Sequence, residues 1–299
     1  MAPMTMSPYN PRILSMSFTA KDLASSDQFL SAILHCANEL IAIYCESPRI
    51  ASIFAAHQRW LLAQAGFALY NGLPDDPVKG LYSARFVDLV VKQKIASRNT
   101  AVAFLQEMLA CRFLRPVQGN ADRRTRLLEP TEIAITHFIR WLKTHFAILD
   151  SLDGKDRVAR LAADPSLFAV VQPRIAAGIF ATAEVRDPGA TFNIFTWANS
   201  GGVIMDYLVW RTGSAETVGD RIVIGPISMK EIRERFLISN THLKRLFKQA
   251  GDMGSVGWTG VPGKSSFWLS RDFVTEYWNY QSQKFAIVDA VAEAVFEWG

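Results

Sequence analysis

Lysine and arginine side chains are concentrated in two short stretches of this 299-residue chain. Eight of them oppose two acidic residues in residues 92–126, and six oppose two acidic residues in residues 233–267. These stretches carry more net positive charge than the whole chain, whose formal net charge is +4, so the remainder is net acidic. Ammonium and guanidinium groups gathered in this way attract phosphate, and the pattern indicates a polyanionic partner such as double-stranded DNA. A solvated basic face without such a partner is the alternative interpretation.

The elements expected around the first stretch would present these side chains on a helix and a hairpin. Apolar periodicity predicts a tight turn at residues 95–97, followed by a helix at residues 98–112 with Ser97 as its N-cap. The expected buried stripe of this helix is Val102, Leu105, Leu109 and Phe113. Two strands, at residues 113–117 and 125–128, enclose a polar turn. Helix, turn, helix and hairpin form a winged helix-turn-helix, in which a helix enters the major groove and the hairpin reaches phosphates.

The second stretch lies in a copy of the first. Residues 28–145, moved forward by 141 positions, align without a gap on residues 169–286, so that Asn99-Thr100 falls on Asn240-Thr241. A repeat of this length indicates a duplicated domain, because solenoid units are only about 20–50 residues long. The expected division is a loose N-terminal arm at residues 1–25, a first repeat at residues 26–150 and a second, divergent repeat at residues 151–299.

Long amphipathic segments flank both basic stretches and are expected to form a shared helical platform. In chain order these helices begin at Ser26, span residues 49–70, follow Thr131, span residues 165–186 and 192–210, and begin with Asp272 as a cap. Residues 212–219 are expected to be a linker. The predicted fold is therefore mainly α, with small β-hairpins on two winged helix-turn-helix domains.

Residues 82–145 resemble the winged-helix domain of the MarR family of bacterial transcription regulators. The resemblance rests on the sequence IASRNTAV at residues 95–102 and on DRRTRLL at residues 122–128. The family pattern continues with Leu-Thr and a Gly, whereas Glu129-Pro130-Thr131 follows here. Family members are mostly dimers with interlocking outer helices, so the resemblance implies a monomeric chain that folds as a fused pseudo-dimer and regulates transcription.

The positive charge lies on different elements in the two copies. The helix positions expected to be exposed in the first copy carry little positive charge: Ala103, Phe104 and Glu107. The aligned positions of the second copy are basic: Lys244, Arg245 and Lys248. We therefore expect the first copy to hold DNA mainly with its hairpin and the second mainly with its helix, on half-sites about one helical turn apart. The residues expected to contact DNA are Ser97, Arg98, Asn99, Thr100, Arg123, Arg124, Arg126, Asn240, Thr241, Lys244, Arg245, Lys248 and Lys264.

Aromatic side chains outside the basic stretches are expected to form the core between the two halves. They are Trp60, Phe67, Tyr70, Phe195, Trp197, Tyr207 and Trp210. An apolar effector pocket at this junction is the alternative, and the resemblance implies a small aromatic or phenolic ligand for it. On a neighbouring helix, His137, Trp141 and His145 share one face, where packing is favoured over metal binding or pH sensing.

Other functional classes lack a sequence signature. Cys36, Cys45 and Cys111 form no C-x-x-C pair, so neither a disulfide framework nor a zinc site is expected. No nucleophile elbow, HExxH motif or dinucleotide fingerprint occurs, and we expect no enzyme activity and no cofactor. The absence of a membrane-length apolar run and of a secretory signal predicts a cytoplasmic protein without membrane contact. The rival interpretation is a winged-helix scaffold that binds protein and has lost DNA binding.

Overall fold

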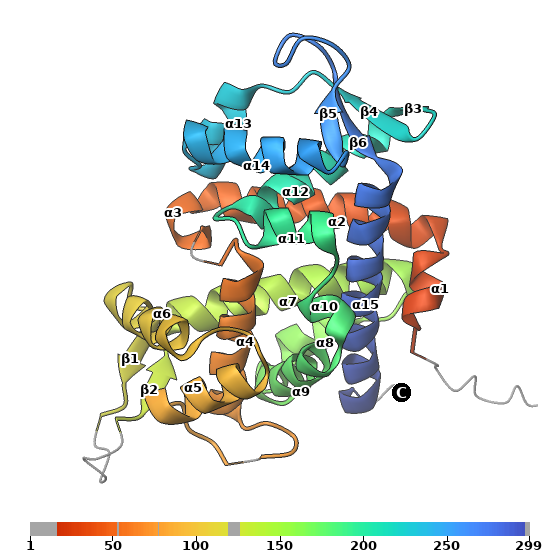
Figure 1. Ribbon diagram of the computed structural model, residues 1–299. Helices are drawn as coiled ribbons and strands as arrows, with labels where there is room; N and C mark the ends of the chain where they lie inside the picture. Colours follow the sequence, from red (N-terminus) through yellow and green to blue (C-terminus); the bar gives the residue numbers. More distant parts are fainter. Residues whose placement is uncertain (1–16, 53, 77, 119–125, 297–299) are drawn as a thin grey trace, which may run out of the picture.

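The computed structural model describes residues 17–52, 54–76, 78–118 and 126–296 and is mainly helical, with small antiparallel sheets (Figure 1). The first half contains α1 (Ala20–Ala24), α2 (Asp27–Glu46), α3 (Pro48–Ala51), α4 (His57–Asn71), α5 (Ser83–Lys92), α6 (Arg98–Ala110), β1 (Leu114–Pro116), β2 (Leu128–Pro130) and α7 (Glu132–Asp153). The second half contains α8 (Arg157–Ala163), α9 (Leu167–Ala181), α10 (Ala183–Arg186), α11 (Ala190–Thr196), α12 (Gly201–Trp210), β3 (Glu216–Val218), β4 (Arg221–Gly225), α13 (Met229–Phe236), α14 (Asn240–Asp252), β5 (Val256–Trp258), β6 (Phe267–Ser270) and α15 (Arg271–Val295). The predicted mainly α class with small β elements is confirmed at this level.

The long helices of the two halves pack crosswise. Helix α2 packs against α12, and α9 packs against α4. A shift of 141 residues aligns α2 with α9 and α4 with α12. The first long helix of each half, α2 or α9, therefore packs against the other half. Within the halves, α2 contacts α7 and α9 contacts α15 in the same relation. Reciprocal contacts of this kind are what a two-fold interface produces, and here they join the buried side chains of both halves into one core.

Helix α2 shows how local sequence sets these elements. The Ser26 hydroxyl accepts a hydrogen bond from the Phe29 amide at 3.2 Å, which confirms the predicted start of the helix. Buried residues follow at helical spacing: Phe29, Ile33, Cys36, Ala37, Ile41 and Tyr44. By length and hydropathy α2 also qualifies as a membrane-spanning segment, which corrects the expectation that no such segment exists.

Three expected helices are interrupted, and a fourth begins earlier than expected. The helix expected at residues 49–70 is divided into α3 and α4, the helix expected at residues 165–186 into α9 and α10, and the helix expected at residues 192–210 into α11 and α12. Ser200 has a left-handed conformation (φ +58°) at the third break. Gly201 follows it, and a Cβ there would lie 1.7 Å from the Phe195 carbonyl oxygen, so the sharp entry into α12 requires glycine. At the start of α15 the N-cap is Ser270, not Asp272.

The segment expected to be a linker forms a hairpin. Strands β3 and β4 pair around a two-residue turn at Gly219-Asp220, where Gly219 has φ +61°. Strand β4 then pairs with β6, which gives a four-stranded antiparallel sheet in the order β3-β4-β6-β5. Since β4 finds its partner almost 50 residues further along the chain, the pairing depends on tertiary contacts that local periodicity does not show.

A buried arginine joins three helices at the seam between the halves. The Arg157 guanidinium is fully buried and pairs with carboxylates of α7 and α15 at 2.6 to 3.1 Å: Asp150, Asp153, Asp289 and Glu293. Asp289 also accepts the Phe18 amide at 2.7 Å, which ties the chain before α1 to the same cluster. Burial opposes the charge, but the carboxylates hold the pKa of Arg157 above its usual value. Asp153, Asp289 and Glu293 have a spacing that suits a metal ion, yet the guanidinium already compensates them.

We expect Arg157→Met to destabilise the protein by about 3–5 kcal/mol, because it leaves four clustered carboxylates without their buried counter-charge. Urea unfolding at pH 7 measures the change. Arg160→Met is the matched control on α8, since Arg160 pairs with Asp156 at an exposed position and its loss should cost less than about 1 kcal/mol. Equal losses in the two variants would contradict the role given to Arg157.

Candidate nucleic-acid interface

The first helix–hairpin unit (α5, α6, β1 and β2) exposes the first turn of α6. The Ser97 hydroxyl accepts a hydrogen bond from the Thr100 amide at 3.2 Å, which confirms the predicted N-cap. Arg98, Asn99 and Thr100 are exposed, and the Arg98 guanidinium lies 3.5 Å from the equally exposed Asp88 carboxylate. The amino end of α6 therefore presents polar side chains to solvent.

The remainder of α6 packs differently from the sequence expectation. Its buried residues are Ala101, Phe104, Leu105 and Met108, so the buried stripe is rotated from the predicted one, with Val102 and Leu109 only half-buried. Phe104, expected to be exposed, stacks on Phe86 at 6.1 Å and lies under the Arg59 guanidinium. Glu107, also expected to be exposed, is half-buried and pairs with Arg59 at 2.8 Å. Contacts with α4 and α5 decide the orientation of this helix, and only Ala103 of the three expected positions is exposed.

The first hairpin is short. Strands β1 and β2 pair with Leu114 opposite Pro130, so the second strand lies at residues 128–130 and not at the predicted residues 125–128. Arg115 pairs across the hairpin with Glu129 at 2.7 Å, and its charge is therefore partly compensated. Arg126 is exposed. Arg123 and Arg124, expected to contact DNA, lie outside the described residues.

The second helix–hairpin unit (α13, α14, β5 and β6) exposes a full basic face. Leu237 takes a left-handed conformation (φ +49°) in the turn before α14, and the Ser239 hydroxyl caps α14 by accepting the His242 amide at 3.2 Å. One face of α14 is buried through Leu243, Leu246, Phe247 and Ala250. The opposite face carries exposed polar and basic residues: Asn240, Thr241, Lys244, Arg245 and Lys248. Of these, Lys248 pairs with Asp252 on the same helix at 2.6 Å.

The second hairpin holds its basic side chain at an ordered tip. The Thr259 amide donates to the Ser266 carbonyl at 2.9 Å and the Gly260 amide to the Ser265 hydroxyl at 3.0 Å. Lys264 is exposed at this tip, and its amide donates to the Val261 carbonyl at 3.0 Å. The hairpin thus projects one ammonium group from a defined turn.

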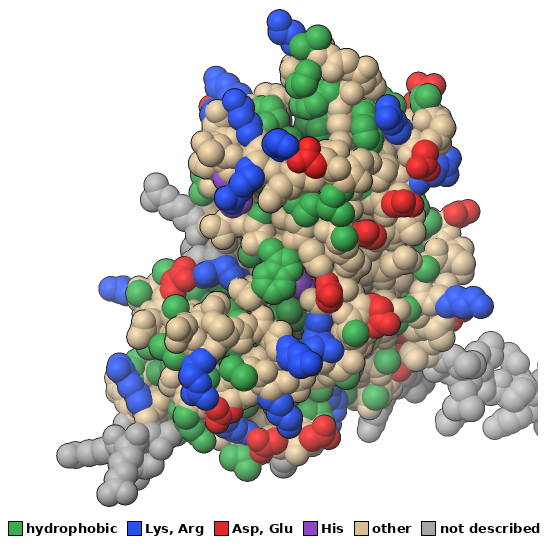
Figure 2. All heavy atoms as spheres, viewed as in Figure 1, with side chains coloured by type: hydrophobic (Ala, Val, Ile, Leu, Met, Phe, Trp, Pro, Cys, Tyr) green, Lys and Arg blue, Asp and Glu red, His purple; other side chains and the backbone are tan. Residues whose placement is uncertain are grey.

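The two units lie at opposite ends of the helical platform, with α5 and α6 at the lower left and α13 and α14 at the upper left of Figure 1. Their hairpins point away from each other in this view. Figure 2 shows basic side chains over the upper unit with few acidic ones among them, and a more mixed distribution over the lower unit. Both amino ends predicted to contact DNA are therefore exposed, but the two units differ in charge.

The aromatic side chains expected at the junction are distributed over three environments. Phe67, Phe195 and Tyr207 are buried in the core, whereas Trp197 and Trp210 are 52% and 38% exposed. Trp60 lines a cavity of about 240 Å³ between the halves, which we call the junction cavity. The junction cavity also contains polar residues that the sequence did not single out: Asp206, Gln281 and Lys284. The available signal was a lysine and a glutamine within the apolar positions of the α15 pattern.

The histidines near this cavity are packed. The His145 Nδ1–H donates to the Trp141 carbonyl at 2.8 Å, and the ring stacks between Trp141 and Phe285. His57 donates from Nε2 to the Val185 carbonyl at 2.8 Å. Burial lowers the pKa of both imidazoles, that of His57 to about 4, so both rings are neutral at pH 7.

Comparison with known proteins adds no family to these observations. No family model, no curated protein and no solved structure matches the chain. Function is therefore inferred from the two units and the junction cavity themselves.

We expect the free energy of unfolding to fall as the pH drops from about 6.5 to about 4, because unfolded histidine takes up a proton that buried His57 refuses. Full protonation would cost about 3 kcal/mol from His57 alone. His57→Gln retains a donor for the Val185 carbonyl and should remove most of this contribution in urea titrations at pH 7 and 4.5. His35→Gln changes an exposed histidine and should retain it. An equally steep acid loss in His57→Gln would show that His57 does not cause it.

Proposed function

We propose that the two helix–hairpin units are winged helix-turn-helix modules and that the chain binds double-stranded DNA as a transcriptional regulator, resembling a MarR dimer fused into one chain. The observation that carries this proposal is α14. One face of this helix is buried, and the other bears two polar residues in its first turn and three basic residues after it. A capped helix with this distribution fits the major groove, where its amino end meets base edges and its cations meet phosphates.

The proposed contacts differ between the units. Asn240 and Thr241 in the first turn of α14 would meet base edges, while Lys244 and Arg245 would meet bases or phosphates one turn later. In α6 only the first turn is available, through Arg98, Asn99 and Thr100, because Phe104 and Glu107 pack against the platform. Arg126 and Lys264 would reach phosphates from the hairpins, and Arg123 and Arg124 remain predictions. Because the two units offer different contacts, we expect the DNA site to be asymmetric.

A protein-binding scaffold is the second candidate. The observation that favours it is the β3–β4 hairpin, which extends the second unit's sheet and leaves β3 as an edge strand with Val218 57% exposed. An exposed strand edge is a common docking place for an extended peptide. DNA binding and peptide docking are separable, since they use different faces of the second unit.

We expect Lys244→Ala/Arg245→Ala to weaken binding to genomic DNA fragments and to reduce the slope of log affinity against log salt by about two units. Mobility shifts at several salt concentrations measure both quantities. A matched control, Lys21→Ala/Arg174→Ala, removes two exposed charges from α1 and α9 and should leave the slope unchanged. If the wild-type chain retards no DNA at low salt, or if both double variants behave alike, the DNA-binding proposal fails and the scaffold remains.

A further inference from the structure

We propose that Lys284 is a nucleophilic amine at the junction cavity, where it condenses reversibly with a small uncharged aldehyde or ketone and holds it as an imine. This reaction would be a chemical activity of the helical platform. It does not depend on the proposed function, because Lys284 belongs to neither helix–hairpin unit. Three features of the molecule support it: a cavity, a buried amine without a counter-charge and unpaired polar atoms in the same walls.

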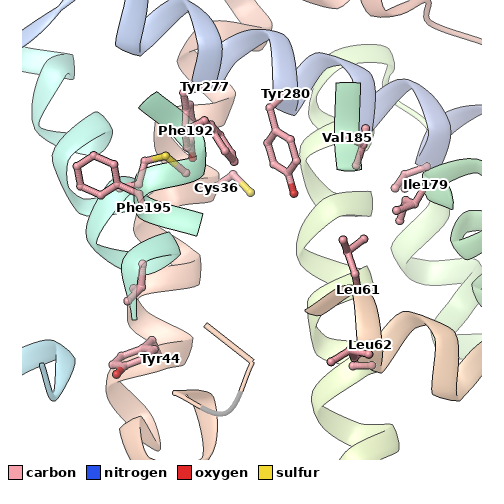
Figure 3. Close-up of a cluster of buried hydrophobic side chains, with 14 of the residues drawn as sticks. Cys36, Tyr44, Leu61, Leu62, Ile179, Val185, Phe192, Phe195, Tyr277 and Tyr280 are labelled. Atoms are coloured by element: carbon pink, nitrogen blue, oxygen red, sulfur yellow. The ribbon is translucent and has the colours of Figure 1, made fainter. Parts of the chain in front are cut away.

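The junction cavity lies between the halves of the chain. Helices α2, α4 and α7 of the first half and α11, α12 and α15 of the second contribute its walls. Figure 3 shows Tyr280 extending from α15, with Phe192 of α11 beside it, and the centroids of these two rings are 4.5 Å apart. The cavity volume of about 240 Å³ exceeds the roughly 150 Å³ that admits benzene, so a carbonyl compound with about six carbon atoms fits.

The amine lines this cavity from α15. Lys284 is only 4% exposed, and its Nζ lies 5.3 Å from the centroid of the Tyr280 ring and 5.5 Å from that of Phe285. Within the described part of the chain, this Nζ makes no hydrogen bond, and no carboxylate lies within ion-pair distance of it. Aromatic faces compensate an ammonium less than a carboxylate does. Burial therefore favours the neutral amine, whose nitrogen carries a free electron pair.

Most ionisable groups around Lys284 carry no charge that would oppose this. Burial keeps them neutral at pH 7, because it lowers the pKa of imidazole and raises the pKa of thiol and phenol. They are Cys36 of α2, His57 of α4, His145 of α7, and Tyr277 and Tyr280 of α15. None of them supplies an anion that would hold the lysine in its ammonium form.

Asp206 of α12 is the acidic residue in the cavity wall. Its carboxylate accepts the Tyr277 hydroxyl at 2.8 Å, and burial raises its pKa to about 6. Burial lowers the pKa of Lys284 by more than the attraction of neighbouring groups, Asp206 among them, raises it. A carboxyl that titrates near neutral pH can give and take a proton, and condensation of an amine with a carbonyl requires both steps.

The condensation balances with these groups alone. The Nζ electron pair attacks the carbonyl carbon, a C–N bond forms, and one proton passes from nitrogen to oxygen to give a carbinolamine. The hydroxyl then takes a proton from the Asp206 carboxyl and leaves as water, while the nitrogen electron pair forms the C=N bond. The Asp206 carboxylate takes back the remaining N–H proton. Amine and carbonyl are thereby converted into imine and water, without an oxidant or a reductant.

Further polar atoms at the cavity lack partners within the described residues. They are Trp60 Nε1, Thr196 Oγ1 and Gln281 Oε1. The indole N–H and the threonine hydroxyl can donate to a carbonyl oxygen, and the glutamine oxygen can accept from the carbinolamine hydroxyl. Unpaired buried polar atoms are rare in folded proteins. Their presence around one mainly apolar space indicates a ligand with an oxygen function on an otherwise apolar body.

The test traps the imine on the full chain. Hexanal and cyclohexanone, each equimolar with the protein, are added with cyanoborohydride at pH 7, and intact-mass spectrometry with peptide mapping locates the adducts. We expect at least one of them to give an adduct on Lys284 with the mass of the carbonyl compound less one oxygen atom. It should form at least about tenfold faster than on any other lysine, because lysines in water are almost wholly protonated at this pH. The peptide map separates any adduct on the terminal amine.

Three controls distinguish this site from surface chemistry. An aldehyde-bearing dextran is too large for the cavity and should label other lysines but not Lys284. A rise from pH 7 to pH 9 should accelerate trapping on lysines in water about a hundredfold, and on Lys284 far less. Lys284→Met should lack the fast adduct, whereas Lys143→Met, at the aligned position of the first repeat, should retain it.

The rates on the wild-type chain decide the test, so it does not depend on the folding of a variant. Absence of an adduct on Lys284, a rate no greater than that of other lysines, labelling of Lys284 by the dextran, or the pH dependence of the other lysines would each overturn the proposal. Adduct formation in a chain that retards no DNA would leave this site intact and remove the proposed function alone.

Discussion

The crossed packing of α2 on α12 and of α9 on α4 is the constraint on which the other features depend. Each half buries its leading helix on the other half, so neither half closes a core by itself. The Arg157 cluster fixes the same arrangement from one end, because it joins α7 and α15, the last long helix of each half. The helix–hairpin units are attached to this platform through α4 and α12. The crossed packing of these helices therefore sets the separation of the two units.

Two halves carried on one chain need not present identical sides at the interface between them. In a symmetric dimer, every substitution appears twice, and a buried charge would have to be accommodated twice. Here Asp206 of the junction cavity aligns with Ala65 of the first half, and the basic face occurs once, on α14. The first unit uses the corresponding face of α6 for packing, through Phe104 and Glu107. The second half therefore has the more basic surface, and it also supplies the polar residues Asp206, Gln281 and Lys284 of the junction cavity.

Arg157 and Lys284, the two buried basic residues in the described part of the chain, have opposite environments. The Arg157 guanidinium pairs through its two terminal nitrogens with four carboxylates and so joins α7, α8 and α15. The Lys284 Nζ lies over the Tyr280 and Phe285 rings beside the junction cavity, with no carboxylate in ion-pair contact among the described residues. The cost of burying charge is similar in kind for both, so the difference lies in what compensates it. For Arg157 the compensation comes from four carboxylates, whereas burial lowers the pKa of Lys284 and so disfavours its charged form.

The sequence alone determined the elements that are encoded locally. Ser26 and Ser97 cap the helices that they were predicted to begin, and the two hairpins lie close to where strand patterns placed them, because capping and short-range periodicity act within a few residues. The face that α6 buries, the β3–β4 hairpin and the junction cavity were decided only by the tertiary structure. Each depends on contacts between segments far apart in the chain. The place of Lys284 among apolar positions of α15 is a local signal, but only the helices that line the junction cavity bury its side chain.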